Sequence, residues 1–181
     1  QFALTRIWEG LTQGVAPSLT LQNIGGVGGA LAGEAQRIYE QLRDQDKEIA
    51  RRVFLGLVQL GEGTRDTRRR TAIESLVSHK DNIEQVKNVI ARFSATSARL
   101  ITLNAADGAT QTAEVTHEAL FDHWQLLNDW LDSSRDDIRF QRGLEEAARH
   151  WDANGRPEGS LWRPPDLDLL RQYHGREIGR A

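Results

Sequence analysis

The histidines are the residues of this chain best suited to catalysis or metal binding, but their spacing favours neither role. They are His79, His117, His123, His150 and His174. His117 and His123 are six residues apart, which on a helix places them about 240° apart and off a common face. Glu118 follows His117 as in the zinc motif H-E-x-x-H, but Phe121 stands in place of the second histidine. We therefore predict no metal site and, since no carboxylates are paired across an evident cleft, no catalytic residue and no activity for this chain by itself.

A glycine-rich stretch, "GGVGGALAGE" at 25–34, has the composition of a phosphate-binding loop. A Walker P-loop needs a lysine after its glycines, and no lysine lies near this stretch. The dinucleotide spacing G-x-G-x-x-G also fails, because Leu31 occupies the third glycine position after Gly26 and Gly28. We expect the glycines to serve close helix packing instead. The residues spaced for that role are Gly25, Gly29 and Gly33.

Four arginines form a basic cluster in "GTRDTRRR", at 63–70. They are Arg65, Arg68, Arg69 and Arg70. Guanidinium groups bind phosphates and carboxylates through paired hydrogen bonds, so the cluster could contact a phosphate or a neighbouring domain. A solvated loop, neutralised by Glu62 and Asp66, explains the same residues equally well. Both interpretations stay open at this point.

The composition is that of an ordinary globular protein of 181 residues, with 27% charged residues and a net charge of -3. The net charge argues against nucleic acid and anionic membranes as partners. There is no cysteine and no apolar run of the roughly 20 residues that span a bilayer, so we expect a cytoplasmic protein. The chain also lacks methionine, even at position 1, and opens inside a helical pattern, which we interpret as a piece of a larger protein.

Apolar spacing predicts a mainly α fold. A first helix is expected to end near Gly10 and Gly14, and the next to run through Tyr39 and Leu42. Three helices then follow: one from Lys47, a second opened by a Thr71 to Glu74 capping box, and a third at 81–95 with Asp81 as N-cap.

Two β-prone stretches follow these helices. "LITL" and "TAEVTH" flank the turn-rich 104–111 and predict a β-hairpin. Three helices and a hairpin form a winged helix, with "ADGA" as its wing. Further on, Leu120, Trp124, Leu127 and Leu131 predict a helix, "SSRDD" at 133–137 a break, and Phe140 to Trp151 a second helix. Residues 166–177 suggest a last helix. We expect Trp124, Trp130, Trp151 and Trp162 to pack between these C-terminal helices.

A winged helix often binds DNA through its third helix, so a DNA-binding domain of a transcription regulator is one alternative. The third helix and its end carry only Lys87, Arg92 and Arg99, and Asp81 and Glu84 offset them. That is little positive charge for an interface whose affinity comes mainly from phosphate neutralisation. Nucleic acid is therefore the weaker hypothesis.

Several segments resemble the region that follows the nucleotide-binding domain of bacterial STAND ATPases, of the novel STAND group often found before WD repeats. The likeness is carried by "VTHEALFDHWQLLNDWL" and "RFQRGLEEAARHWDANGRPEGSLWRPPDLDLL". It is supported by "QFALTRIWEG", "IGGVGGALAGEAQRIYEQL" and "FLGLVQLGEGTRDTRRR", so it covers nearly the whole chain.

The resemblance implies a domain order. Residues 1–44 would end a helical domain, 45–125 would be the winged helix, and 126–181 would be helices leading to a sensor or repeat region. The P-loop ATPase domain would lie upstream and bind ADP or ATP with Mg²⁺, while this segment alone would bind no cofactor. Exchange of ADP for ATP would open the protein and permit homo-oligomerisation in signal transduction. The remaining alternative is an interaction scaffold that does not respond to nucleotide.

The resemblance also implies a nucleotide-sensing residue. "VTHEAL" is similar to the Met-His-Asp motif of the related NB-ARC switches, whose histidine reaches the β-phosphate of ADP. His117 matches that histidine, Glu118 replaces the aspartate and Thr116 replaces the methionine. The plainer interpretation is that His117 begins a helix and bonds to its own backbone.

Overall fold

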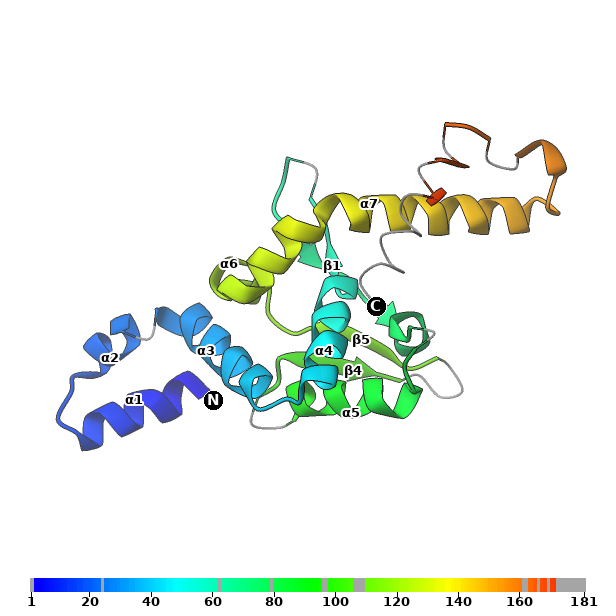
Figure 1. Cartoon of the computed structure of the whole chain (residues 1–181). Helices are drawn as coiled ribbons and strands as arrows, with labels where there is room; N and C mark the ends of the chain where they lie inside the picture. The colour runs from blue at the N-terminus through cyan, green and yellow to red at the C-terminus, as the bar shows by residue number, and fades with distance from the viewer. Residues whose placement is uncertain are drawn as a thin grey trace. The chain divides into compact units, whose positions relative to one another are not determined.

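The structure is a computed structural model that describes residues 2–23, 25–61, 63–78, 80–95, 98–105, 110–160, 163–165, 167–168 and 170–171. Most of the described residues are helical, and the strands are short and antiparallel (Figure 1). The chain forms two compact units, residues 1–133 and 134–181. The predicted mainly α fold is confirmed, whereas the domain boundaries at 44/45 and 125/126 stay predictions. None of the described helices is both long and apolar enough to cross a bilayer.

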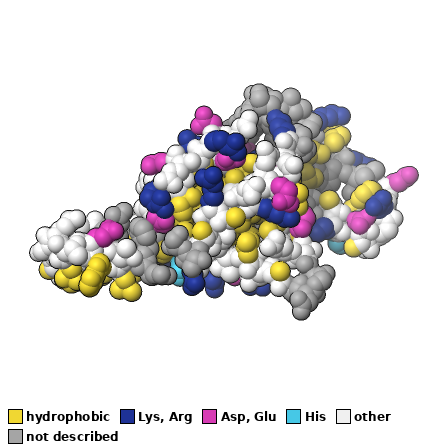
Figure 2. All heavy atoms as spheres, turned by 90° about the horizontal axis from the view of Figure 1, so that it is seen from below, with side chains coloured by type: hydrophobic (Ala, Val, Ile, Leu, Met, Phe, Trp, Pro, Cys, Tyr) yellow, Lys and Arg dark blue, Asp and Glu magenta, His cyan; other side chains and the backbone are white. Residues whose placement is uncertain are grey.

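Three helices, α1 (Phe2–Thr12), α2 (Pro17–Asn23) and α3 (Gly26–Glu40), open the first unit. α1 ends at Thr12, between Gly10 and Gly14 as predicted, although Gly10 itself lies inside the helix. A side chain at Gly10 would collide with Thr20, which indicates that this glycine lets α2 approach α1. Figure 2 shows hydrophobic side chains gathered on the surface of these helices. The exposed apolar residues there are Leu4, Trp8, Leu11, Leu19 and Val27.

Close packing of the glycine-rich stretch occurs at a different residue from those predicted. A Cβ at Gly28 would collide with the ring of His123, so α3 and α6 (Ala119–His123) approach each other there. Gly33 is exposed and has no heavy atom near the position of an added Cβ. The stretch forms a helix in which a glycine permits close packing, as predicted, but the sequence could not show which face of α3 contacts α6.

The helix predicted from Lys47 is α4 (Asp44–Gly56), which begins slightly earlier. It leads into a two-stranded hairpin, β1 (Val58–Gln59) and β2 (Thr67–Arg68). The predicted capping box at Thr71 is wrong, because Thr71 and Ala72 form strand β3. The Thr71 hydroxyl donates to the carbonyl of Gly56 at 2.9 Å, and the second helix is only a 3-10 turn, η1 (Ile73–Leu76).

The third helix, α5 (Ile83–Ser94), is confirmed and buries Val86, Val89, Ile90 and Phe93. Its N-cap is Asn82, whereas the predicted N-cap was Asp81. Asn82 accepts from the backbone of Glu84, and Gln85 reaches back to the backbone of Asn82. The Asp81 carboxylate instead accepts from the Ser78 N–H and pairs with Arg52 of α4.

The predicted hairpin is confirmed as β4 (Ile101–Asn104) and β5 (Thr112–Val115), with Ile101 opposite Val115. Strand β3 pairs with the other edge of β5, so the strand order is β3-β5-β4. α5 packs along β4 (Figure 1). Residues 106–109, the expected "ADGA" wing, lie outside the described residues.

The C-terminal helices break at a different place from that predicted. The chain leaves the helical conformation at Trp124, after α6, and then continues as one helix, α7 (Gln125–Ala153). The predicted break at 133–137 is absent, because Ser, Arg and Asp are at most moderately weaker helix formers than alanine and do not by themselves interrupt a helix. A 3-10 turn, η2 (Glu158–Ser160), follows. Trp162 and most of 166–177 lie outside the described residues.

An aromatic cluster forms part of the core of the first unit. Trp124 packs edge-on against Phe54 with ring centroids 4.9 Å apart, and Trp130 packs against Tyr39 at 5.2 Å. Trp124 and Trp130 therefore pack on α3 and α4, and the expectation that they lie between C-terminal helices was wrong. Burial raises the pKa of the Tyr39 phenol above its ordinary 10.0, and the charge of Glu48 adds to this effect.

Candidate functional site

His117 is the middle residue of the three-residue connection between β5 and α6. The N–H of Thr116 donates to Leu100 at 2.9 Å and extends the strand ladder, and the carbonyl of His117 accepts from Leu120 at 3.2 Å. The His117 side chain is exposed. Among the described residues its ring has no hydrogen-bond partner, so the helix start uses the backbone of His117 and not its imidazole. The ring is available to a ligand.

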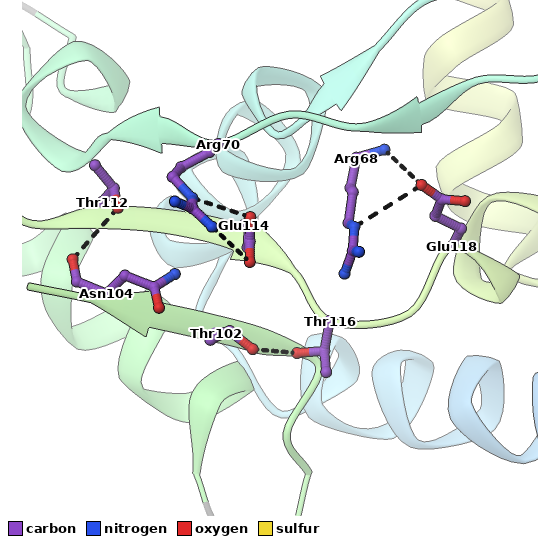
Figure 3. Close-up of polar contacts among 8 residues, drawn as sticks. All are labelled: Arg68, Arg70, Thr102, Asn104, Thr112, Glu114, Thr116 and Glu118. Carbon is purple, nitrogen blue, oxygen red and sulfur yellow. Dashed lines mark hydrogen bonds and ion pairs between the residues drawn. The ribbon is translucent and has the colours of Figure 1, made fainter.

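Glu118 is the N-cap residue of α6, yet its side chain does not cap that helix. Its carboxylate accepts from the backbone N–H of Arg68 at 3.3 Å and lies 3.9 Å from the Arg68 Nε (Figure 3). Strand β2 is thus attached to the first residue after His117. The predicted sensor and the arginine cluster therefore lie side by side, although about fifty positions separate them in the sequence.

The other arginines of the cluster follow the same pattern. Arg70 makes a two-pronged contact with Glu114 of β5, from its Nε at 3.2 Å and from its Nη2 at 3.4 Å (Figure 3). Arg65 lies 3.7 Å from Asp122 of α6. We call these three pairs the arginine clasp; they are Arg70–Glu114, Arg68–Glu118 and Arg65–Asp122.

Arg69 differs from its three neighbours, because it is half-buried and its backbone N–H donates to Leu57 at 2.8 Å. Asp66, one of the two expected neutralising acids, accepts from the Gly61 N–H at 2.9 Å. Glu62, the other, lies outside the described residues. The three arginines of the clasp therefore have carboxylate partners in 114–122.

The acidic residues of the clasp follow a regular spacing in the sequence. Acidic residues recur every fourth position in "EVTHEALFD", at Glu114, Glu118 and Asp122. Sequence reasoning missed them because a surface carboxylate is usually solvated, and nothing local shows which basic segment it faces. No group of three or more metal-binding side chains occurs among the described residues.

The outer face of the sheet beside the clasp is polar. The hydroxyls of Thr102 on β4 and Thr116 after β5 lie 2.9 Å apart, and the Thr112 hydroxyl donates to the Asn104 carbonyl at 3.3 Å (Figure 3). Alternate residues of β5, Ala113 and Val115, are fully buried. The strand thus turns its apolar residues to the core and its polar ones to the clasp.

Comparison with protein families decides the broader relationship. The model of the family described as Novel STAND NTPase 1 matches residues 1–159. The chain belongs to this Novel STAND NTPase 1 family. The match includes His117, Glu118 and the whole clasp, and the STAND resemblance inferred from the sequence is confirmed at the level of the family. No curated protein and no solved structure matches the chain.

Proposed function

We propose that this member of the Novel STAND NTPase 1 family is a non-catalytic regulatory segment that senses whether its NTPase holds ADP or ATP. The observation that carries the proposal is the exposed ring of His117 at the start of α6, beside the arginine clasp. A neutral imidazole can donate one hydrogen bond to a phosphate, and an imidazolium adds a charge. Glu118 sets the local structure, and Arg65, Arg68, Arg69 and Arg70 form the basic surface beside it.

We infer that residues 45–125 are a winged helix. The order α4, β3, η1, α5, β4 and β5, with the β1–β2 hairpin inserted between α4 and β3, supports this assignment, as does the pairing of β3 with the far edge of β5. In this assignment η1 is the second helix reduced to a single turn, and the wing would be "ADGA", which lies outside the described residues. His117 then lies two residues after the last strand of the winged helix.

The proposed partners belong to the same protein. A P-loop domain would bind ADP or ATP with Mg²⁺, and a sensor or repeat region, such as WD repeats, would receive the signal. A ligand shifts a conformational equilibrium only by its difference in affinity for the two states, so His117 must contact ADP in one state and not in the other. Homo-oligomerisation on activation and a cytoplasmic location complete the proposal.

DNA binding is the second function compatible with a winged helix, and the charges of α5 give it little support. Lys87 pairs with Glu84 at 3.2 Å, which leaves fewer free cations on the helix that would enter a groove. The guanidinium groups of Arg65, Arg68 and Arg70 are each within 4 Å of a carboxylate. A nucleotide-independent scaffold is the third function, and nucleotide binding by the longer protein separates it from the first.

Replacing His117 by alanine in the protein that contains both this segment and its NTPase domain tests the sensor role. We expect ADP to dissociate roughly tenfold to hundredfold faster, because a hydrogen bond to a charged group contributes about 1.5–3 kcal/mol. Release of a fluorescent ADP analogue measures the rate. His150→Ala, an exposed histidine on α7, is the matched control and should leave the rate unchanged. Equal rates for His117→Ala and the parent protein would reject the sensor.

A further inference from the structure

The contact of the arginine clasp at the base of the β1–β2 hairpin is shorter than the two contacts farther along the hairpin. At the base, both Arg70 nitrogens lie within hydrogen-bond distance of Glu114, whose side chain is only 18% exposed. Toward the tip, the guanidinium groups of Arg68 and Arg65 are 3.9 and 3.7 Å from their carboxylates. These two distances are too long for hydrogen bonds, so the guanidinium groups of Arg68 and Arg65 interact with their carboxylates through charge alone. We call Arg68–Glu118 and Arg65–Asp122 the outer pairs.

The two outer pairs also lie in water. The Glu118 and Asp122 side chains are 52% and 47% exposed, and those of Arg68 and Arg65 are 53% and 85% exposed. Water and salt screen such pairs, and many of them contribute little to stability. Breaking the two outer pairs therefore costs little free energy. The Arg70–Glu114 pair, whose carboxylate is largely buried, keeps the base of the hairpin in place.

A phosphate chain is a stronger ligand for the same guanidinium groups. Each of Glu118 and Asp122 offers a single negative charge, while a di- or triphosphate offers several charges and acceptor oxygens that match the planar fork of arginine. The backbone N–H of Arg68 also donates to Glu118, at 3.3 Å, but this hydrogen bond is exposed, so water can replace it when Glu118 leaves. The geometry thus favours replacement of the carboxylates by a phosphate chain.

We propose that Glu118 and Asp122 are internal competitors, which occupy Arg68 and Arg65 until a polyphosphate group displaces them. The clasp is then an autoinhibited anion site on the β1–β2 hairpin, selective for linear phosphate chains such as that of a nucleotide. This inference rests on the proposed function, since it describes the regulation of the same site beside His117.

Displacement of Glu118 and Asp122 would change both the start of α6 and the β1–β2 hairpin. Glu118 is the N-cap residue of α6 and follows His117 directly, so its release from Arg68 frees the turn that carries the imidazole. When Asp122 is released from Arg65, the tip of the β1–β2 hairpin loses its ion pair with α6. By linkage, whatever holds Glu118 and Asp122 on the arginines weakens phosphate binding by the same factor.

The test measures inorganic triphosphate binding to the 181-residue chain by NMR titration at low, fixed ionic strength. In Glu118→Gln/Asp122→Asn, the internal competitors lose their charge, and we expect the dissociation constant to fall about threefold to tenfold. In Arg65→Gln/Arg68→Gln we expect binding to weaken at least about tenfold. Because all four side chains are exposed, the fold should persist, and the amide spectrum reports directly whether it does.

The matched control removes the same charge elsewhere. Asp136→Asn/Asp152→Asn neutralises two exposed carboxylates on α7 that also pair with arginines, at 3.3 and 2.7 Å. It should change the dissociation constant less than about twofold, because these carboxylates pair with Arg139 and Arg156 and not with the arginines of the clasp. An equal gain in both double variants would mean that net charge alone acts and would overturn the proposal. So would unchanged affinity in Glu118→Gln/Asp122→Asn.

The clasp and the sensor can fail separately. Tighter triphosphate binding in Glu118→Gln/Asp122→Asn, together with unchanged ADP release in His117→Ala, would support the clasp and reject the sensor. Faster ADP release in His117→Ala with no change in triphosphate affinity would support the sensor and reject the clasp.

Discussion

At the scale of single residues, Trp124 connects more parts of the first unit than any sequence pattern suggested. Its indole N–H donates to the Gln36 side chain of α3 at 2.9 Å, and its ring is 2% exposed and contacts Phe54 of α4. It is also the residue at which the chain turns from α6 into α7. One side chain therefore fixes the position of the His117 segment against two earlier helices.

Trp124→Phe should destabilise the chain by about 2 kcal/mol, because the smaller ring leaves a cavity and the Gln36 oxygen loses its donor. Urea unfolding followed by circular dichroism measures the change. Trp8→Phe is the matched control: Trp8 is 68% exposed, and its replacement should stay within about 0.5 kcal/mol of the parent. The same loss in both variants would show that Trp124 is not a packing centre.

The sequence predicted single residues well only where their role is local. Ile90 and Phe93 follow from helical periodicity, and both are fully buried. The ion pairs of His117's neighbours do not follow, because Arg68 and Glu118 are fifty residues apart and only the folded hairpin brings them together. Asn82 could have been chosen over Asp81 from Gln85, which completes its capping box.

At the scale of elements, the β1–β2 hairpin positions the arginines. Val58 and Leu60 are buried and fix its base, and Gly61 begins its turn. A Cβ on Gly61 would collide with the backbone of Thr64 and lie 2.7 Å from the Arg65 carbonyl oxygen. Backbone atoms cannot move aside as the end of a side chain can, so the turn depends on this glycine.

Gly61→Ala and Gly33→Ala should therefore have opposite effects on stability. We expect the first to destabilise the chain by about 1–3 kcal/mol, as overpacking does. The second, on an exposed face of α3, should stabilise it by up to about 1 kcal/mol through helix propensity. Thermal unfolding of both variants checks the signs. Destabilisation by Gly33→Ala would mean that α3 is covered where it is described as exposed.

Element types were more predictable than their ends. The hairpin β4–β5 and helix α5 have strong local patterns, and both were found. Thr71 was assigned to a helix because its spacing to Glu74 fits a capping box, but pairing with Ala113 of β5 makes it a strand. That pairing is a long-range contact, and no local pattern contains it.

At the scale of the whole molecule, the hydrophobic core belongs to one part of the chain. Among the described residues, every buried hydrophobic side chain lies between Ala30 and Leu131. The part of α7 beyond residue 134 has no buried residue among those described. The free energy of folding should therefore come almost entirely from the first unit, which includes His117 and the clasp.

Truncation tests this division. A chain ending at Phe140, two turns beyond the last core leucine, should unfold within about 0.5 kcal/mol of the full chain, since surface deletions leave the core intact. A chain ending at His123 loses Trp124, Leu127 and Leu131, and should not fold, because three such losses exceed the usual stability of about 5–15 kcal/mol or come close to it. Urea unfolding of both chains measures the difference. A large loss in the longer chain would show that residues 141–181 stabilise the first unit, and the clasp would then have to be studied only in their presence.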